Sequence, residues 1–263
     1  MMNEDFERFK KREVKAKTIF VIRPVPKNIA YFFVRRYHYL ADAKFFSMYS
    51  YGLFYRETDK LVGVATFSLP QGNVALKGWF GLPNSDKSVV ELSRLCVLPE
   101  LNKTNATSFL LSGAIRLLKK EDSIRAIITL ADSSRHVGSI YQVCNFQYYG
   151  LTDKKNDFFR FDGVVNPRGK VSDVHGVWVP RTQKHRYAYI LDKSLHCLYE
   201  EQPKPKATDV LEVNGCWFCK GSGKVFDNRF KEWYTCPRCK EFHKIDEGEK
   251  NEDKCEEEKP DCV

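Results

Sequence analysis

Short apolar runs that are rich in β-branched and aromatic residues recur along most of the chain, and polar or turn-forming residues separate them. Runs of this length and composition are typical of β-strands. The strands predicted from them are Met48–Tyr55, Leu61–Leu69, Val89–Leu98, Ile124–Ala131, Phe158–Val165, Gly176–Val179 and Arg186–Leu191.

Other segments have the spacing of helices. Asn28–Leu40 follows two prolines and begins with Asn, a good capping residue. Ala106–Lys120 places Leu110 and Ala114 on one face, and His136–Cys144 is a shorter helix. The order of strands and helices in the middle of the chain predicts a mostly parallel sheet there, with helices packed on its faces. We therefore expect an α/β (α+β) fold with a mixed central sheet.

The segment Val89–Leu98 is expected to be a central strand. Both of its alternating faces are mainly apolar, which is the pattern of a strand that is covered on both sides. Arg94 interrupts this pattern. A charged side chain in such a place needs a partner or a ligand, so Arg94 is a candidate functional residue.

The composition of the chain changes after the last predicted strand. Residues 1–199 contain the predicted strands and helices and form the expected main domain. Residues 200–212 are rich in proline and charge, which predicts an extended linker. Residues 213–243 contain paired cysteines. Residues 244–263 are too charged and too poor in apolar groups to fold, so a disordered acidic tail is expected.

Charge is distributed unevenly along the chain. The formal net charge is +9, but the segment Lys244–Val263 holds four Lys against nine Asp or Glu, so the preceding residues carry +14. A body this basic is typical of proteins that bind nucleic acid, because neutralising phosphates releases their counterions. A basic surface that serves only solubility is the alternative.

The sequence also bears on compartment. No apolar stretch approaches the roughly 18–20 residues that a membrane helix needs, so no membrane partner is expected. Residues Met1–Lys17 mix acidic and basic side chains and lack the apolar core of a secretory signal, which predicts a cytoplasmic protein. The nine cysteines are odd in number and some are paired in spacing, so metal ligation is favoured over disulfides.

Two C-x2-C pairs, Cys216 with Cys219 and Cys236 with Cys239, are separated by sixteen residues. Four thiolates from two such turns, closed by a hairpin between them, match the tetrahedral coordination that Zn²⁺ prefers. Because four protein ligands leave no open position, the predicted zinc ribbon is structural rather than catalytic. Its aromatic and basic side chains either grip nucleic acid or form the ribbon's own small core, and both interpretations stay open.

The middle of the chain resembles the GNAT acyltransferase fold in the order of its elements. The strand Val89–Leu98, the helix and strand that follow it, and the segment Ser139–Phe146 carry this resemblance. In that fold a helix N-terminus binds the pyrophosphate of the donor, which implies a cofactor-binding role for Asn102, Thr104 and Asn105. The Gln/Arg-x-x-Gly-x-Gly/Ala motif of acetyl-CoA users is missing, which argues against acetyl-CoA and leaves the donor unidentified.

Five short motifs are spread over roughly residues 30–191: Arg36–Leu40, Glu91–Leu95, Ala131–Ser134, Ile140–Tyr141 and Pro180–Tyr187. Together and in this order, they resemble the motifs of the Mom family of phage DNA-modification proteins. The resemblance implies that the N6 amine of adenine in double-stranded DNA is methylcarbamoylated in the cytoplasm of an infected bacterium, which shields a phage genome from restriction. The catalytic residues that it implies are His38, Tyr39, Arg94, Asp132 and Tyr141.

The chemistry of these residues is consistent with such a transfer. Adenine N6 is a poor nucleophile, so the reaction needs a general base and strong orientation. His38 is a candidate base or metal ligand, and Asp132 either accepts a hydrogen bond from the amine or orients His38. Arg94 is suited to hold a carboxylate or phosphate of the donor, and Tyr141 to protonate a leaving group. Ordinary packing, or a structural ion pair between Arg94 and Asp132, is the alternative.

A stacked adenine must leave the duplex to be modified, and aromatic side chains often receive such a base. The candidates are Tyr37, Tyr39, Tyr49 and Tyr51. A basic run is predicted to contact phosphates, unless it is only a solvated turn; it consists of Arg181, Lys184, His185 and Arg186. Two other functions stay open: an N-acetyltransferase that acts on another amine, and an inactive zinc protein that binds nucleic acid.

Overall fold

The structure is a computed structural model, and it describes residues 2–38, 44–70, 75–83, 85–102, 104–121, 123–160, 176–206, 224–227 and 232–235. The chain forms two compact units. The first contains residues 1–131, 138–150 and 185–205, and the second contains residues 132–137, 151–184 and 206–263. Among the described residues, no helix has both the length and the apolar character of a membrane span.

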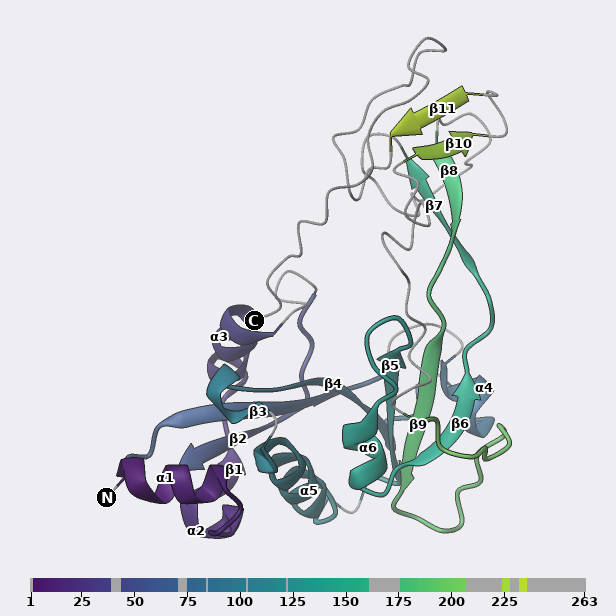
Figure 1. Ribbon diagram of the computed structural model, residues 1–263. Coiled ribbons are helices and arrows are strands. Elements are labelled where there is room, and N and C mark those ends of the chain that lie inside the picture. The colour runs from purple at the N-terminus through teal and green to yellow at the C-terminus, as the bar shows by residue number, and fades with distance from the viewer. Residues whose placement is uncertain are drawn as a thin grey trace. The chain divides into compact units, whose positions relative to one another are not determined.

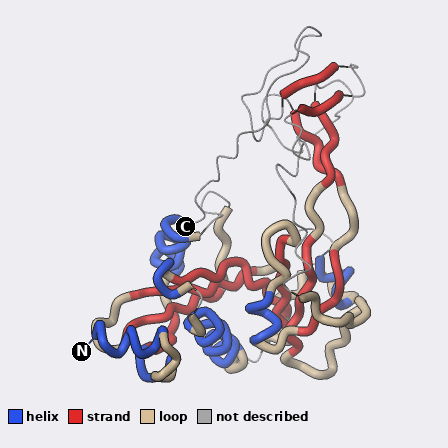
Figure 2. The backbone as a smooth tube through the Cα atoms, viewed as in Figure 1, coloured by secondary structure: helices blue, strands red, loops and turns tan. Residues whose placement is uncertain are grey.

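A seven-stranded sheet is the main feature of the fold, with the strand order β1-β2-β3-β4-β5-β9-β6 (Figures 1 and 2). Strands β1 to β4 pair antiparallel, whereas β4 and β5 pair parallel, so the sheet is mixed. The strands are β1 (Phe20–Pro24), β2 (Tyr49–Tyr55), β3 (Leu61–Ser68), β4 (Val89–Val97), β5 (Ala126–Asp132), β6 (Gln147–Leu151) and β9 (Lys184–Ile190).

Helices cover both faces of the antiparallel part of this sheet. Helix α3 (Lys27–Tyr37) packs on one face of β2, β3 and β4, and α5 (Ala106–Leu118) packs on the other (Figure 1). Gly113 lets α5 approach β1 closely, because a Cβ atom there would collide with the side chain of Ile22. The remaining helices are α1 (Met2–Lys10), α2 (Ala16–Ile19), α4 (Ala75–Phe80), the 3₁₀ turn η1 (Pro99–Leu101) and α6 (Ser139–Val143).

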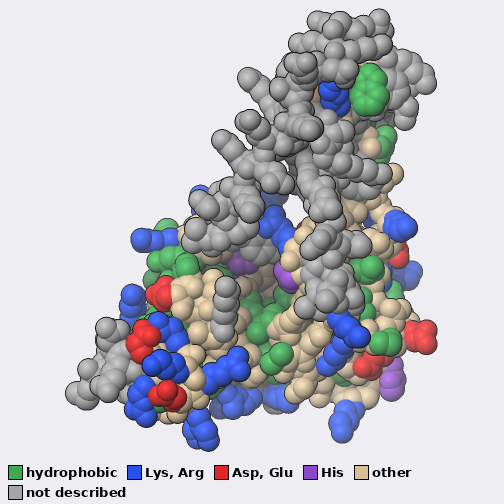
Figure 3. Space-filling view, viewed as in Figure 1, with side chains coloured by type: hydrophobic (Ala, Val, Ile, Leu, Met, Phe, Trp, Pro, Cys, Tyr) green, Lys and Arg blue, Asp and Glu red, His purple; other side chains and the backbone are tan. Residues whose placement is uncertain are grey.

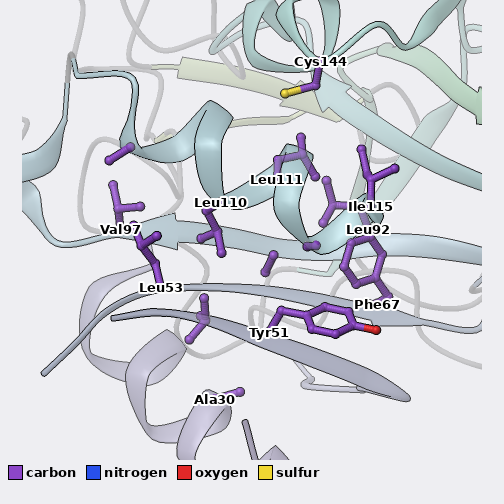
Figure 4. Close-up of a cluster of buried hydrophobic side chains, with 14 of the residues drawn as sticks. Ala30, Tyr51, Leu53, Phe67, Leu92, Val97, Leu110, Leu111, Ile115 and Cys144 are labelled. Carbon is purple, nitrogen blue, oxygen red and sulfur yellow. The ribbon is translucent and has the colours of Figure 1, made fainter. Parts of the chain in front are cut away.

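The core of the first unit lies between these helices and the sheet. Figure 4 shows Leu110, Leu111 and Ile115 of α5 on one side of the strands and Ala30 of α3 on the other. Burying a leucine of this kind stabilises the fold by roughly 1.5–3 kcal/mol. Strand β3 is buried along nearly its whole length because both of its faces are covered, which explains its unbroken apolar sequence.

The described part of the second unit contains two small antiparallel ladders. Strand β7 (Asn156–Arg160) pairs with β8 (Gly176–Pro180), and β10 (Lys224–Asp227) pairs with β11 (Glu232–Thr235). In the sequence, the β10–β11 hairpin lies between the two C-x2-C pairs. The four cysteines themselves lie outside the described residues.

The predicted mixed sheet with flanking helices is confirmed. Strand β4 is the fourth of seven and therefore central, and its parallel pairing with β5 is as predicted. The prediction of a mostly parallel middle is too broad, because β3 pairs with β4 antiparallel. Helix α1 and strands β1 and β6 were not predicted. Helix α1 is mostly charged, and Phe6 and Phe9 attach it to the core.

Candidate functional site

A β-bulge in β4 carries two polar residues of the candidate site, Ser93 and Arg94. Thr66 of β3 pairs with Arg94, but the next residue, Phe67, pairs with Leu92, so Ser93 is an extra residue. The Ser93 hydroxyl lies 3.0 Å from the carbonyl oxygen of Thr66, to which it donates. A bulge of this kind bends a strand and redirects its side chains, and it interrupts the apolar alternation at the position of Arg94.

Strands β4 and β5 also stop pairing beside this bulge. Their parallel ladder ends with Glu91 opposite Ile128. One residue farther along β5, the Thr129 hydroxyl donates a hydrogen bond to the carbonyl oxygen of Leu92 over 3.3 Å. Within the described residues, the part of β4 that carries Arg94 therefore lies beyond the β4–β5 ladder.

The guanidinium of Arg94 is held by backbone carbonyl groups. Its Nη1 donates to the carbonyl oxygen of Ser93 over 2.6 Å, and its Nη2 donates to that of Lys44 over 3.2 Å. Its Nε is buried and has no hydrogen-bond partner among the described residues. A buried donor that is left unused is costly, so this N–H suits an acceptor group of a bound molecule.

The charge of Arg94 affects the side chain of His38. His38 follows the last residue of α3, and its backbone N–H donates to the carbonyl oxygen of Val34 over 2.9 Å. Burial, and then the positive charge of Arg94, lower the pKa of His38 from 6.5 to about 4. The imidazole is therefore neutral at physiological pH and is able to accept a proton or to bind a metal ion.

In the second unit, Asp132 lies at the end of β5 in a set of hydrogen bonds. The backbone N–H and the hydroxyl of Ser134 both donate to its carboxylate, over 3.1 and 2.8 Å. Burial acts to raise the pKa of Asp132, but the hydrogen bonds from Ser134 and Thr182 outweigh it, and the pKa lies below its ordinary value. This carboxylate is therefore ionised and already oriented.

His136, which follows Asp132 by four residues, was not among the candidate residues predicted from the sequence. Its backbone N–H donates to the carbonyl oxygen of Asp132 over 3.1 Å. Burial lowers the pKa of His136, and the negative charge of Asp132 opposes this shift. The i, i+4 spacing directly after a strand is the signal that could have identified this pair.

The five predicted catalytic residues are thus distributed over both units. His38, Arg94 and Tyr141 belong to the first unit, and His38 and Arg94 interact electrostatically. Tyr141 packs against the ring of Tyr187, with ring centroids 5.4 Å apart. Asp132 belongs to the second unit, and Tyr39 lies outside the described residues. The expectation that the fold brings His38, Arg94 and Asp132 to one cleft stays a prediction.

Gly138 precedes α6, the helix that carries Tyr141. Its replacement tests the packing of the Tyr141 ring against that of Tyr187. Its φ of +77° is a left-handed conformation, and an added Cβ atom would lie 2.7 Å from the ring of Tyr187 and 2.9 Å from that of Tyr141. We expect Gly138→Ala to lower the free energy of unfolding by about 2–3 kcal/mol, measured by denaturant titration.

Gly81→Ala is the matched control for this substitution. Gly81 also has a positive φ, of +69°, but an added Cβ atom would meet only Leu198, at 3.8 Å. The control should therefore lose only about 1 kcal/mol, from backbone strain alone. Equal losses of unfolding free energy in the two variants would mean that the rings of Tyr141 and Tyr187 move aside at little cost.

The loop predicted to bind a cofactor is held by local hydrogen bonds. The Thr104 hydroxyl donates to the carbonyl oxygen of Leu101 over 2.6 Å and accepts from the backbone N–H of Ala106 over 3.2 Å. Asn102 ends η1, and Asn105 precedes α5 without a capping hydrogen bond from its side chain. Thr104 thus supports the start of α5, and the cofactor role of all three residues stays a prediction.

Two members of the predicted phosphate-binding run lie in the interior. His185 is 4% exposed, and its Nδ1 lies 2.9 Å from the hydroxyl of Tyr148. Arg186 is 8% exposed, and its guanidinium lies 4.2 Å from the ring centroid of Tyr199. The prediction that His185 and Arg186 contact phosphates is therefore corrected. On strand β9 both side chains lie against aromatic rings, those of Tyr148 and Tyr199, and away from solvent.

The other two members of the run belong to the second unit. Arg181 is exposed, and its Nε lies 3.5 Å from the carboxylate of Asp157. Lys184 is half-buried and lies close enough to Asp132 to affect its pKa. Both stay candidates for contact with phosphates.

The candidate base-receiving tyrosines also differ in exposure. Tyr37 is exposed and Tyr49 is half-buried, but Tyr51 is only 4% exposed and packs against Phe67 in the core. Tyr51 is therefore a core residue, because β2 is buried along nearly its whole length. Tyr39 lies outside the described residues.

Metal binding was predicted for Cys216, Cys219, Cys236 and Cys239, all of which lie outside the described residues. In the part of the chain that the structure does describe, no group of three or more His, Cys, Asp or Glu side chains is arranged to hold a metal ion. The zinc site stays a prediction from the sequence.

Several solved structures are similar to this chain. They include IAA acetyltransferase from Bacillus cereus (13% identity, TM-score 0.39, 65% of this chain and 99% of that one). The ribosomal-protein-S18-alanine N-acetyltransferase from Escherichia coli has 12% identity and a TM-score of 0.41, over 69% of this chain and 100% of that one. The spermidine/spermine N-acetyltransferase from Vibrio cholerae has 8% identity and a TM-score of 0.42, over 68% and 97%. Similarity at this level says nothing about substrate.

Family membership rests on a different comparison. No curated protein matches the chain. The model of the Mom protein family matches residues 19–206, which include β1 to β9 and every described residue of the candidate site. Because this match spans well over half of the 263 residues, the chain belongs to the Mom protein family.

Proposed function

We propose that the protein transfers a methylcarbamoyl (acetamido-type) group to the N6 amine of adenine in DNA and so protects a phage genome from restriction. Membership of the Mom family supports this proposal. The observation that carries it is the guanidinium of Arg94 at the bulge of β4, whose buried Nε has no hydrogen-bond partner among the described residues, and whose charge acts on the neutral imidazole of His38. A proton acceptor beside a fixed cation is what transfer to a weakly nucleophilic amine requires.

The proposed reaction forms a bond between N6 and the methylene carbon of the transferred group. The bond from that carbon to its leaving group breaks, and the leaving group takes the electron pair. His38 accepts the proton that N6 loses. Arg94 binds an anionic part of the donor through its Nε–H, which has no partner among the described residues, and keeps the reacting carbon in position. The roles of Tyr39, Asp132 and Tyr141 remain as the sequence predicts them.

Resistance to restriction enzymes tests this function. DNA from bacteria that express the protein should resist a panel of enzymes whose recognition sites contain adenine. Enzymes whose sites contain only guanine and cytosine serve as the matched control and should cut normally. Normal cutting by the whole panel would contradict the proposal, and resistance to both classes would indicate an effect unrelated to adenine.

Double-stranded DNA is the proposed partner, and zinc is the proposed structural cofactor. The charge of +14 on residues 1–243 supports the first, because such a surface attracts a polyanion. The paired spacing of Cys216, Cys219, Cys236 and Cys239 supports the second. Arg181 remains the most accessible candidate for phosphate contact within the basic run.

The protonation of His38 provides a prediction that does not depend on activity. Since burial and Arg94 lower its pKa to about 4, the imidazole should stay neutral as the pH falls through 6.5. Protonation favours the unfolded chain, so this residue's stabilising contribution is complete above about pH 6.5 and is lost as the pH falls toward 4. A proton-detected NMR titration, assigned by comparison with His38→Gln, should show a midpoint near 4. A midpoint near 6.5 would contradict this picture of the site.

A further inference from the structure

Helix α3 has an apolar surface that the core does not use. Its Ala30, Phe33 and Val34 are buried against the sheet. On the outward side, Phe32 is 65% exposed, and Tyr31 beside it is also exposed. Large aromatic side chains that face solvent together on one helix are typical of a binding surface rather than of a core.

The segment that follows α3 extends this surface. The rings of Tyr31 and Phe45 lie with their centroids 5.5 Å apart, which holds the segment 44–48 against the helix. Phe46 and Met48 of that segment are each 47% exposed. We call Tyr31, Phe32, Arg35, Arg36 and Phe46 the α3 surface.

Positive charge surrounds these aromatic side chains. Arg35 and Arg36 follow Phe32 by three and four residues, so all three lie on one side of the helix. Lys27 and Lys44 are exposed at the ends of the same region, and neither α3 nor the described segment 44–48 contains Asp or Glu. Figure 3 shows hydrophobic and basic side chains gathered over α3. Two copies of such a surface repel each other, whereas a polyanion is attracted.

The α3 surface adjoins the candidate site in the first unit. His38 follows the last residue of α3, and the segment 44–48 begins at Lys44, whose carbonyl oxygen accepts a hydrogen bond from Arg94. A nucleic-acid strand that lies along the α3 surface therefore extends toward both His38 and Arg94.

We propose that the α3 surface binds a DNA strand whose bases are unpaired, next to the adenine that enters the site. Phe32 and Tyr31 stack on the bases, and Arg35 and Arg36 bind the flanking phosphates. Aromatic rings interleaved with cations are the arrangement that single-stranded nucleic acid requires, because each base has a face for stacking and each phosphate has a charge. This inference rests on the proposed function in taking DNA as the substrate.

Binding of fluorescent oligonucleotides tests the inference without any donor. The probes are a single strand, a duplex with one mismatched adenine, and the fully paired duplex of the same sequence. Phe32→Ala should weaken binding of the first two about tenfold and binding of the paired duplex less. Arg35→Gln with Arg36→Gln should weaken all three and reduce the slope of log affinity against log salt by about 1.5 units.

Matched controls come from elsewhere in the first unit. Arg116 and Lys120 are exposed cations four residues apart at the end of α5, and Arg116→Gln with Lys120→Gln removes the same charge. Val143 is 68% exposed, so Val143→Ala matches the exposure of Phe32. Both controls should bind the single strand within about twofold of the parent protein, and thermal unfolding should show that every variant is folded.

Two results would overturn the inference. One is unchanged binding of the single strand by Phe32→Ala and by the double arginine variant. The other is a shift from dimer to monomer in sedimentation of Phe32→Ala, which would assign the surface to a second copy of the chain. Failure of the proposed function would look different. Binding of unpaired DNA that depends on the α3 surface, together with unmodified adenine, would refute the proposed function but support the α3 surface as a binding site.

Discussion

Arg94→Gln should abolish adenine modification, with a loss of at least about a hundredfold, while the protein stays folded. The guanidinium is the only charge that the structure places on the bulged part of β4 between Leu92 and Val97, and its buried Nε is unused among the described residues. Removing a fixed donor or cation of this kind typically costs 10²–10³ in rate. The free energy of unfolding should change by only about 1–2 kcal/mol, because the hydrogen bonds lost are to carbonyl groups.

Nucleoside analysis and thermal unfolding of the same preparations measure both quantities. Arg94→Lys keeps the charge but loses the planar fork, so it should recover little activity. His38→Gln should lose about 10²–10⁴-fold if the imidazole is the base. Arg116→Gln, an exposed arginine on α5, is the control and should be fully active. Full activity in Arg94→Gln would remove this residue from the mechanism.

Purified protein should contain about one zinc per chain, and Cys219→Ser with Cys236→Ser should remove it. A ribbon of about 30 residues is too small to fold by its apolar core alone, and structural zinc in such modules contributes roughly 10–16 kcal/mol of apparent binding free energy. We therefore expect the double variant to lose the β10–β11 hairpin, as measured by protection of its amide protons from exchange.

Cys255→Ser with Cys262→Ser is the matched control for the zinc prediction. These two cysteines lie in the acidic tail and lack paired spacing, so the control should keep its zinc. Metal analysis by mass spectrometry gives the stoichiometry directly. Zinc that persists in the Cys219 and Cys236 double variant would show that the ligands are other residues.

The central fold could be predicted because its strongest signals are local. Strand β4 has two apolar faces, and α5 has an apolar stripe at helical spacing, so both were identified from periodicity. Helix α1 was not predicted because few of its residues are apolar. Strand β1 has a short apolar run, Phe20–Ile22, and its partner β2 lies about thirty residues farther along the chain. The antiparallel pairing of β3 with β4 depends on such distant contacts, which periodicity does not encode.

The site was predictable only in part, for a related reason. Arg94 stood out because a charge interrupted an apolar strand, and the motif around His38 directed attention to it. The burial of Arg186 and of Tyr51 could not be read from the sequence, because exposure of a strand residue depends on what covers each face. The α3 surface was likewise hidden, since Phe32 looks like a core residue until the sheet shows which side of the helix is buried.

Mass analysis of nucleosides from DNA modified by the purified protein tests the central claim most directly. A new deoxyadenosine that is heavier by one methylcarbamoyl substituent at N6 is expected with the parent protein and should be missing with His38→Gln. Deoxyadenosine that carries an acetyl group instead would identify an acetyltransferase acting on DNA. Unmodified deoxyadenosine, from a protein that is folded and supplied with extract of its host cell, would contradict the account.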